Sequence, residues 1–469
     1  MAIPDTLPDR IGPVLYLRGG DADEMRLRAL VAVRDGGAAP MLDAGHGPAA
    51  MPVAARRAGF TFHAADFALP AAAAAQYAVD GAAFDVRTEL TGNLRIGYVS
   101  CNGEEHGDLD RDGAERDAMW AALGRAHDAA PLSILLQGGD QVYADEDGRA
   151  HPLAEGWPDA LPGPLSAAQR AEVHEALESA FTARYLTLYA RPEFAHIAAR
   201  VPTLAMWDDH DICDGWGSLR ADALDSDLGR TLFAVARAAF LLFQRGEGGT
   251  TAPGALGMHL DLPGLRIAAP DLRSERRPER VMGPEGWRQT AAMLAAPAPE
   301  RVLVMSSVPA LGPRLSVVET LVNRTGLMRK YSDDLRDQWQ SHAHRTEWQR
   351  FLRALSDLHA GGTRTTVLSG EIHLATCATM QTPAGPLHQL VASGIAHTPP
   401  PRGFARALGL LARFGEAPLR GQPIRLHPLP GRRPIYTNER NFLMLERTGG
   451  AWQAVWHLEE SGATDPLPI

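Results

Sequence analysis

Leu132-Ser133-Ile134-Leu135-Leu136, closed by Gly139-Asp140-Gln141-Val142-Tyr143, is the stretch that decides the fold. The short apolar run predicts a buried strand. The glycine turn behind it brings an aspartate, and one turn later a tyrosine, to the end of that strand. The stretch therefore predicts an α/β sheet with chemistry at a strand end.

Two further strand ends carry titratable residues in the same way. Leu204-Ala205-Met206-Trp207 leads into Asp208-Asp209-His210-Asp211, and an apolar run from residue 365 leads into Glu371-Ile372-His373. Carboxylates and imidazoles at the ends of several strands are how an α/β sheet assembles a metal site. The three strand ends together predict metal-ion chemistry on phosphate esters.

Composition sets the class of protein. At 469 residues the chain exceeds a single typical core, which predicts two structural units. The net charge of −10 argues against a nucleic-acid surface, and no stretch approaches the roughly 20 apolar residues of a membrane span. The N-terminus shows no signal peptide. A cytoplasmic location is expected if the chain is complete, and a periplasmic or secreted one only if a signal was removed. The oligomeric state stays open.

The pattern of predicted secondary structure changes near residue 93. Residues 1–92 alternate short β-like runs with turns and predict an N-terminal β-sandwich-like domain. Residues 93–460 alternate strands with helical stretches and predict an α/β catalytic domain. Within it, the Pro-, Gly- and Arg-rich segment 398–434 predicts an irregular flap.

Asp140 and Tyr143 are candidate metal ligands. Each oxygen of a carboxylate can face a different cation, so Asp140 can bridge two metals, and a tyrosinate is a hard donor that suits a ferric ion. The alternative is an aspartate that caps the following helix, with the tyrosine packed nearby.

The run from Asp208 to Asp211 needs a cation or hydrogen bonds to offset desolvation and mutual repulsion. One carboxylate can bind metal while His210 donates a proton to the phosphate oxygens or hydrogen-bonds them. The alternative is a solvated acidic turn.

Two more positions complete the candidate set. Glu371 and His373 share one face of an extended chain, a suitable pitch for gripping a metal pair, although an ordinary exposed strand end is the alternative. Cys101 ends the first α/β strand, where its thiolate would bind a transition metal. A lone cysteine is otherwise core filler.

These motifs, in this order, resemble the PhoD-type alkaline phosphatases of the calcineurin-like metallophosphoesterase superfamily. The resemblance spans about residues 94 to 450 and includes Tyr189-Ala190-Arg191-Pro192-Glu193-Phe194 and Asp271-Leu272-Arg273-Ser274-Glu275-Arg276. It implies a metallophosphoesterase-like two-sheet α/β core behind an N-terminal β-sandwich.

The resemblance also implies a mixed metal site. Fe³⁺ is expected on Cys101, Asp140, Tyr143 and His373, and Ca²⁺ on Asp140, Asp209 and Glu371. Mn²⁺, Mg²⁺ or Zn²⁺ are possible substitutes. The chain departs from the pattern three times: Val99-Ser100-Cys101 replaces the superfamily's Asp-x-His, Glu371 stands where the family more often carries Asp, and the signal of the family's exported members is not seen.

The expected activity is metal-dependent hydrolysis of small-molecule phosphate monoesters or diesters by a metal-bound hydroxide. His210 is expected to stabilise the leaving group, Asp211 to orient its ring, and Arg273 to draw off charge, unless Arg273 is a structural arginine paired with Asp271 or Glu275. The alternatives are a phosphotriesterase or phospholipase-like diesterase on the same site, and a non-enzymatic, metal-stabilised binding module.

Overall fold

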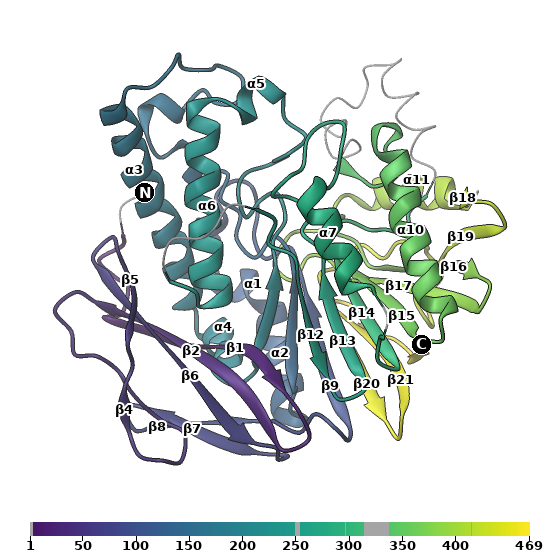
Figure 1. Ribbon diagram of the computed structural model, residues 1–469, viewed down its shortest axis with the longest axis horizontal. Coiled ribbons are helices and arrows are strands. Elements are labelled where there is room, and N and C mark those ends of the chain that lie inside the picture. Colours follow the sequence, from purple (N-terminus) through teal and green to yellow (C-terminus); the bar gives the residue numbers. More distant parts are fainter. Residues whose placement is uncertain (1–2, 249–253, 296, 314–336, 414) are drawn as a thin grey trace.

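The computed structural model describes residues 3–248, 254–295, 297–313, 337–413 and 415–469. Two large β-sheets pack against each other through a shared apolar cluster, and helices cover their outer faces (Figure 1). Ile96 and Leu136 from one sheet meet Met305 and Leu368 from the other in that cluster. The predicted two-sheet α/β core and the β-rich N-terminal region are both confirmed.

The first sheet contains the strands after which three of the predicted motifs follow. In spatial order it runs β22 (Gly462–Ala463), β21 (Ala451–Leu458), β20 (Asn441–Thr448), β9 (Leu94–Val99), β10 (Ile134–Gly138), β11 (Thr203–Met206), β1 (Arg10–Gly20), β2 (Glu24–Arg34), β6 (Phe60–Pro70) and β5 (Val53–Arg57), with β23 (Leu467–Pro468) paired to β21. Strands β9, β10 and β11 are parallel, with Leu135 opposite both Gly97 and Thr203. Their carboxyl ends therefore lie at one edge of the sheet.

The second sheet supplies the remaining motif. Its order is β12 (Met258–Leu262), β13 (Leu265–Ala269), β14 (Arg301–Ser306), β15 (Arg364–Ser369), β17 (Gly385–Val391), β16 (Thr376–Thr382), β19 (Gln422–His427) and β18 (Glu416–Leu419). Strands β13, β14, β15 and β17 are parallel, and Glu371 and His373 follow β15.

The helices flank the two sheets. They are α1 (Gly113–Arg116), α2 (Ala118–Ala129), α3 (Ala167–Tyr189), α4 (Pro192–Ala198), α5 (Ala221–Leu224), α6 (Asp227–Arg245), α7 (Pro284–Met293), α10 (Arg345–Ala360) and α11 (Arg402–Ala412), with 3₁₀ turns η1 (Asp108–Asp110), η2 (Asp147–Arg149), η3 (Pro152–Ala154) and η5 (His342–His344). Helix α3 begins with a reciprocal capping box between Ser166 and Gln169. Helix α6 ends at Arg245 and is followed by the C-cap residue Gly246. The φ of Gly246 is 62°, a left-handed conformation that favours glycine.

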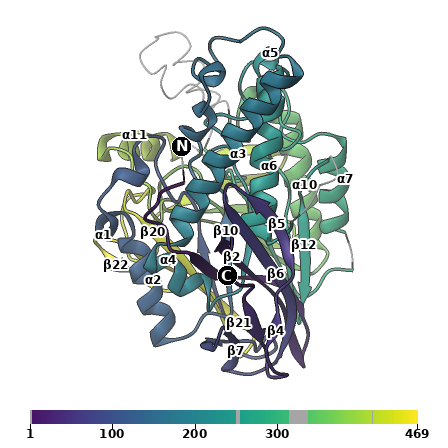
Figure 2. The same cartoon turned by 90° about the vertical axis from the view of Figure 1, so that its left-hand side faces the viewer.

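The N-terminal strands continue the first sheet. Strand β1 pairs with β11 in parallel, Tyr16 opposite Thr203, across the predicted boundary at residue 92. A smaller sheet, β4 (Ala49–Ala50), β3 (Met41–Asp43), β7 (Ala75–Val79) and β8 (Ala82–Val86), packs on it through the same apolar cluster. These strands lie below α3 and α6 in both views (Figures 1 and 2). The division at 92 and 93 remains a prediction.

The described residues of the predicted flap are not irregular, although a role as a flap remains a prediction. Segment 398–434 contains α11 and the strands β18 and β19, and β19 joins the second sheet by pairing with β16. Its prolines and glycines mark the ends of these elements: Pro401 precedes the first turn of α11, and Gly421 makes the turn between the two strands. A high content of proline and glycine therefore marks the ends of these elements and does not indicate that the segment lacks regular structure.

Candidate metal centre

The site lies where the loops after β9, β10, β11 and β15 converge. Two glycines permit the approach: a Cβ at Gly139, whose φ is 108°, would lie 2.8 Å from the Asp208 Cβ, and a Cβ at Gly370 would lie 2.2 Å from the Ser100 Oγ. The backbone N–H of Cys101 donates to the Gly139 carbonyl at 3.2 Å. A main-chain hydrogen bond thus joins the loop after β9 to the loop after β10, although the two motifs are far apart in the sequence.

Backbone strain concentrates at this convergence. Six non-glycine residues in the described part of the chain have a positive φ, and four of them are Cys101 (55°), Asp140 (54°), Glu371 (68°) and His373 (51°). Such conformations cost about 1 to 3 kcal/mol each and persist where the surroundings enforce them, typically at functional sites. The strain marks the same residues that the sequence motifs marked.

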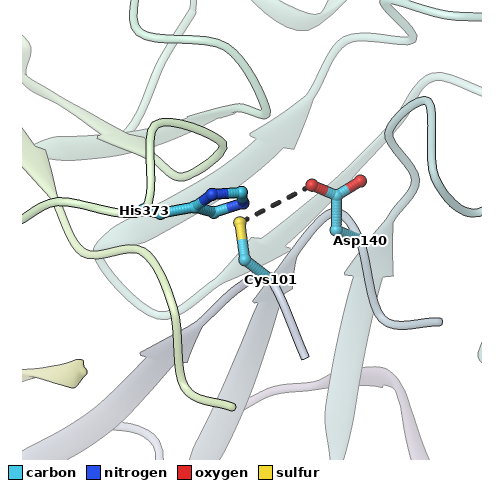
Figure 3. A group of neighbouring side chains, drawn as sticks. All are labelled: Cys101, Asp140 and His373. Atoms are coloured by element: carbon cyan, nitrogen blue, oxygen red, sulfur yellow. Dashed lines mark hydrogen bonds between the residues drawn. The ribbon is translucent and has the colours of Figure 1, made fainter. Parts of the chain in front are cut away.

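Cys101, Asp140 and His373 point toward one another (Figure 3) and offer ligand atoms within 4.8 Å of one another. The Cys101 Sγ lies 3.5 Å from the Asp140 Oδ2, and the Tyr143 hydroxyl lies 3.0 Å from the His373 Nε2. Ser393 supports the group, because its Oγ lies 3.1 Å from that Sγ and accepts the His373 N–H at 2.7 Å. The structure brings together all four side chains expected to bind iron.

This group fits a bound cation. The Asp140 Oδ1 is buried and has no hydrogen-bond partner among the residues that the structure describes. Burial and the neighbouring Asp208 carboxylate raise the pKa of Asp140 well above its usual value. Burial and the Asp140 carboxylate raise the pKa of the Cys101 thiol in the same way. Burial and the nearby His397 lower the pKa of His373. A cation would restore the charged carboxylate and thiolate. The thiolate, imidazole and carboxylate donor set suits a transition metal.

A second, all-oxygen group consists of Asp140, Asp208 and Asp209. The expected calcium set included Glu371 instead of Asp208. Glu371 is absent from the candidate groups of the described residues, and its Oε2 accepts a hydrogen bond from the Gln338 Nε2 at 2.6 Å. Its role as a calcium ligand therefore remains a prediction. Carboxylate oxygens alone suit a hard cation.

Arg273 is not free to meet a substrate. Its side chain is 0% exposed and forms ion pairs with Asp208, with Asp209 at 3.3 Å and with Asp337 at 2.5 Å. Asp271 was a suggested partner of the Arg273 guanidinium. The hydrogen bond that it accepts from Arg273 comes from the backbone N–H, at 2.9 Å. The predicted catalytic role is therefore corrected to a structural one: Arg273 neutralises buried carboxylates and ties the loop after β13 to that after β11. The all-oxygen group consequently has less uncompensated charge than the cysteine group.

His210 is oriented by Asp145. The His210 Nδ1 lies 3.0 and 3.2 Å from the two Asp145 oxygens, which leaves Nε2 for substrate. The Tyr143 ring stacks on the imidazole with centroids 4.3 Å apart. Although burial lowers the pKa of His210, Asp145 and Asp209 raise it well above its usual value. A raised pKa favours the protonated ring, which is the form that can donate a proton.

Asp211 has a different role from the predicted one. Its carboxylate accepts backbone N–H groups from Asp140 and Asp208, both at 2.9 Å, from Gln141 at 3.1 Å and from Val142 at 3.3 Å. It therefore ties the loop after β10 to the loop after β11. The orienting contact to His210 belongs to Asp145, so that part of the prediction is wrong.

Replacement of Asp211 tests this structural role. Asp211→Ala leaves four N–H donors without their acceptor and should lower the free energy of unfolding by about 3 kcal/mol or more. Urea denaturation followed by circular dichroism measures the change. Asp159→Ala, at an exposed aspartate, is the matched control and should shift stability by less than about 0.5 kcal/mol. Equal stability of the two variants would contradict the role.

The sequence reading missed two members of the site. Asp145 stands two residues after Tyr143, just beyond the opening motif, and this nearby carboxylate was the signal that could have identified it. His397 stacks on His373 with ring centroids 3.4 Å apart, and its Nε2 lies 3.5 Å from the Glu105 Oε2. His397 follows a strand of the second sheet without any neighbouring motif, so only the fold identifies it.

Comparison with known proteins agrees with this fold. Residues 102–252 match the family described as PhoD related phosphatase. A solved structure of PhoD superposes with a TM-score of 0.59 and 11% identity, covering 99% of this chain and 90% of that one. Uncharacterized protein YGR266W of Saccharomyces cerevisiae is 23% identical over 377 residues, 64% of this chain and 53% of its own length. The chain thus spans about half the length of that curated relative.

In the described ranges, no helix combines the length and apolarity that crossing a bilayer requires.

Proposed function

We propose that this chain, which belongs with the PhoD-type phosphatases through its residues 102–252 and its fold, hydrolyses phosphate esters with metal ions held at the candidate metal centre. The family match supports phosphatase activity. Metal dependence and the choice of ester are the proposal's own steps.

One observation carries the metal dependence. The Asp140 Oδ1 is buried without a partner, beside a thiol and an imidazole whose ligand atoms lie within 4.8 Å. A buried carboxylate oxygen that lacks a hydrogen bond is costly unless a cation compensates it. Cys101, Asp140, Tyr143 and His373 would hold a transition metal, and Asp140 with Asp209 a hard cation.

Metal ions supply Lewis acidity toward phosphoryl oxygens and lower the pKa of water. The chain's own residues do the rest. The ring of Tyr143, which stacks on His210 and lies tilted against His397, would form a wall beside the ester. His210, charged and oriented by Asp145, donates its Nε2 proton to the leaving oxygen. Asp145 holds the ring through Nδ1 and stabilises the imidazolium.

Chelation should remove activity. We expect the purified protein to lose more than about 90% of its phosphatase activity after dialysis against a strong chelator, and to regain it with Fe, Mn²⁺, Mg²⁺ or Zn²⁺ together with Ca²⁺. Ferric phenolate or thiolate coordination would also colour the protein, and the visible absorption band would disappear with the metal. Full activity after verified metal depletion would contradict metal dependence.

A panel of phosphate esters tests the substrate class. Aryl and alkyl monoesters, diesters and triesters are compared at equal concentration for the wild type and for Asp209→Asn. We expect monoesters or diesters to react fastest, and Asp209→Asn to slow every productive ester. A preference for triesters would favour the phosphotriesterase alternative, and no hydrolysis by metal-loaded protein would refute the proposed function.

A further inference from the structure

Segment 398–434 has a charge unlike that of the rest of the chain. It contains seven arginines and one acidic residue, Glu416, in a protein whose net charge is −10. Five of its arginines are exposed and, within the described part of the chain, take part in no ion pair: Arg406, Arg413, Arg420, Arg425 and Arg433. The proposed hydrolytic reaction makes no use of this basic surface.

Helix α11 adds an exposed apolar face to the basic segment. Large hydrophobic side chains are exposed at only four described positions, and two of them are the neighbours Leu410 (59% exposed) and Leu411 (37%). Helix α11 lies at the molecular edge beside the label of β18 (Figure 1). These leucines therefore lie where a large surface can reach them.

The faces of α11 are segregated. Ala405, Leu408 and Ala412, spaced by three and four residues, pack on the core around Tyr436. The opposite side carries Leu410, with Ala407 and Leu411 beside it, all exposed or partly exposed. At 100° per residue, Arg402, Arg406 and Arg413 fall together on one flank between the core and the outward apolar face.

We propose that α11 docks the protein on the surface of an anionic phospholipid membrane. Leu410 and Leu411 enter the boundary between headgroups and acyl chains, while Arg406 and Arg413 meet lipid phosphates. An interfacial helix has this arrangement, with apolar residues outward and arginines at its flank. The net charge of the protein is −10, so the protein as a whole is not attracted to such a membrane, and the arginine segment favours one orientation.

The chemistry favours lipid over an acidic protein or nucleic acid. Charge alone would serve those partners, whereas the two outward leucines gain only from leaving water. The position also connects with the site: α11 begins five residues after His397, and Thr398 donates a hydrogen bond to Glu104 from its hydroxyl. A docked α11 would hold the loop of His397 beside the lipid surface.

Vesicle sedimentation tests the docking without any turnover. The full-length protein is mixed with vesicles of phosphatidylcholine containing about 30% phosphatidylserine, and with vesicles of phosphatidylcholine alone. We expect binding to the anionic vesicles, at least about tenfold weaker binding to the neutral ones, and release at about 0.5 M NaCl. Because no reaction is measured, the result is independent of the proposed hydrolysis.

Variants separate the leucine and arginine contributions. L410D/L411D and R406E/R413E should each weaken binding to anionic vesicles at least about tenfold. Met41→Asp and Arg125→Glu alter exposed residues of the same types on β3 and α2, and should bind as the wild type does. All altered side chains are exposed, so the melting temperatures should agree within a few degrees, which scanning calorimetry checks.

Three results would overturn the proposal. These are no sedimentation of the wild type with anionic vesicles at low salt, equal binding by L410D/L411D, and equal loss with the two control variants. Equal binding by L410D/L411D would indicate a purely electrostatic surface, such as one for an acidic protein.

Discussion

Asp140→Asn should abolish phosphoester hydrolysis, with kcat/KM falling at least about 10³-fold, and should remove most bound metal. Asp140 belongs to two of the three candidate groups among the described residues, the one with Cys101 and His373 and the one with Asp208 and Asp209. The amide keeps the shape of the side chain but not its charge. Its Oδ1 position is the buried, unpartnered one, so no other group can replace it.

Metal analysis by mass spectrometry and steady-state assays measure these effects on one preparation. Circular dichroism should show an intact fold, because the backbone N–H of residue 140 still donates to Asp211. Asp159→Asn, at an exposed site, is the matched control and should keep wild-type metal content and rate. Near-normal turnover with normal metal content in Asp140→Asn would rule out its bridging role.

His210→Ala should slow alkyl phosphates by about 10² to 10⁴-fold and activated aryl phosphates much less. An alkoxide leaving group needs the proton that the charged imidazole supplies, whereas a nitrophenolate leaves without it. Asp145→Asn should show the same pattern in weaker form, by about 10 to 100-fold, since it only orients and charges His210. The ratio of the rate loss on alkyl phosphates to that on aryl phosphates thus tests whether Asp145 acts by positioning His210.

The metal content distinguishes the possible roles of His210. Its Nδ1 is occupied by Asp145, and we expect His210→Ala to retain wild-type metal within error. If the variant loses a metal ion, His210 is a ligand of the group formed with Asp209 and Asp214. If all esters slow equally, the proton donor is another residue, and His397 is the nearest imidazole stacked on the site.

The sequence allowed the metal centre to be predicted where chemistry follows a strand directly. Apolar runs ending at Asp140, Asp208 and Glu371 are local signals. Parallel pairing places the ends of β10 and β11 at one edge of the first sheet, whereas β15 belongs to the second sheet and meets them through the packing of the two sheets. The N-terminal β-rich region was equally visible in its alternation of short runs and turns. What failed depended on partners distant in sequence.

Arg273 and Asp211 illustrate that failure. Nothing near Arg273 in the sequence announces Asp337, with which it is buried, and nothing near Asp211 shows that four N–H groups from two loops converge on it. Glu371 has the right spacing from His373, but its φ of 68° turns the backbone away from the extended geometry on which the same-face argument relied. Tertiary packing, not local pattern, assigned these roles.

Anomalous diffraction from crystals of the metal-loaded protein tests the central claim most directly. Data collected above and below the iron edge, and at the corresponding edges of other candidate metals, locate each ion and identify its element. We expect a transition-metal peak bonded to the Cys101 Sγ, an Asp140 oxygen and the His373 Nε2 in protein that hydrolyses phosphate esters. An active crystalline protein with no anomalous peak at these three side chains would contradict the account.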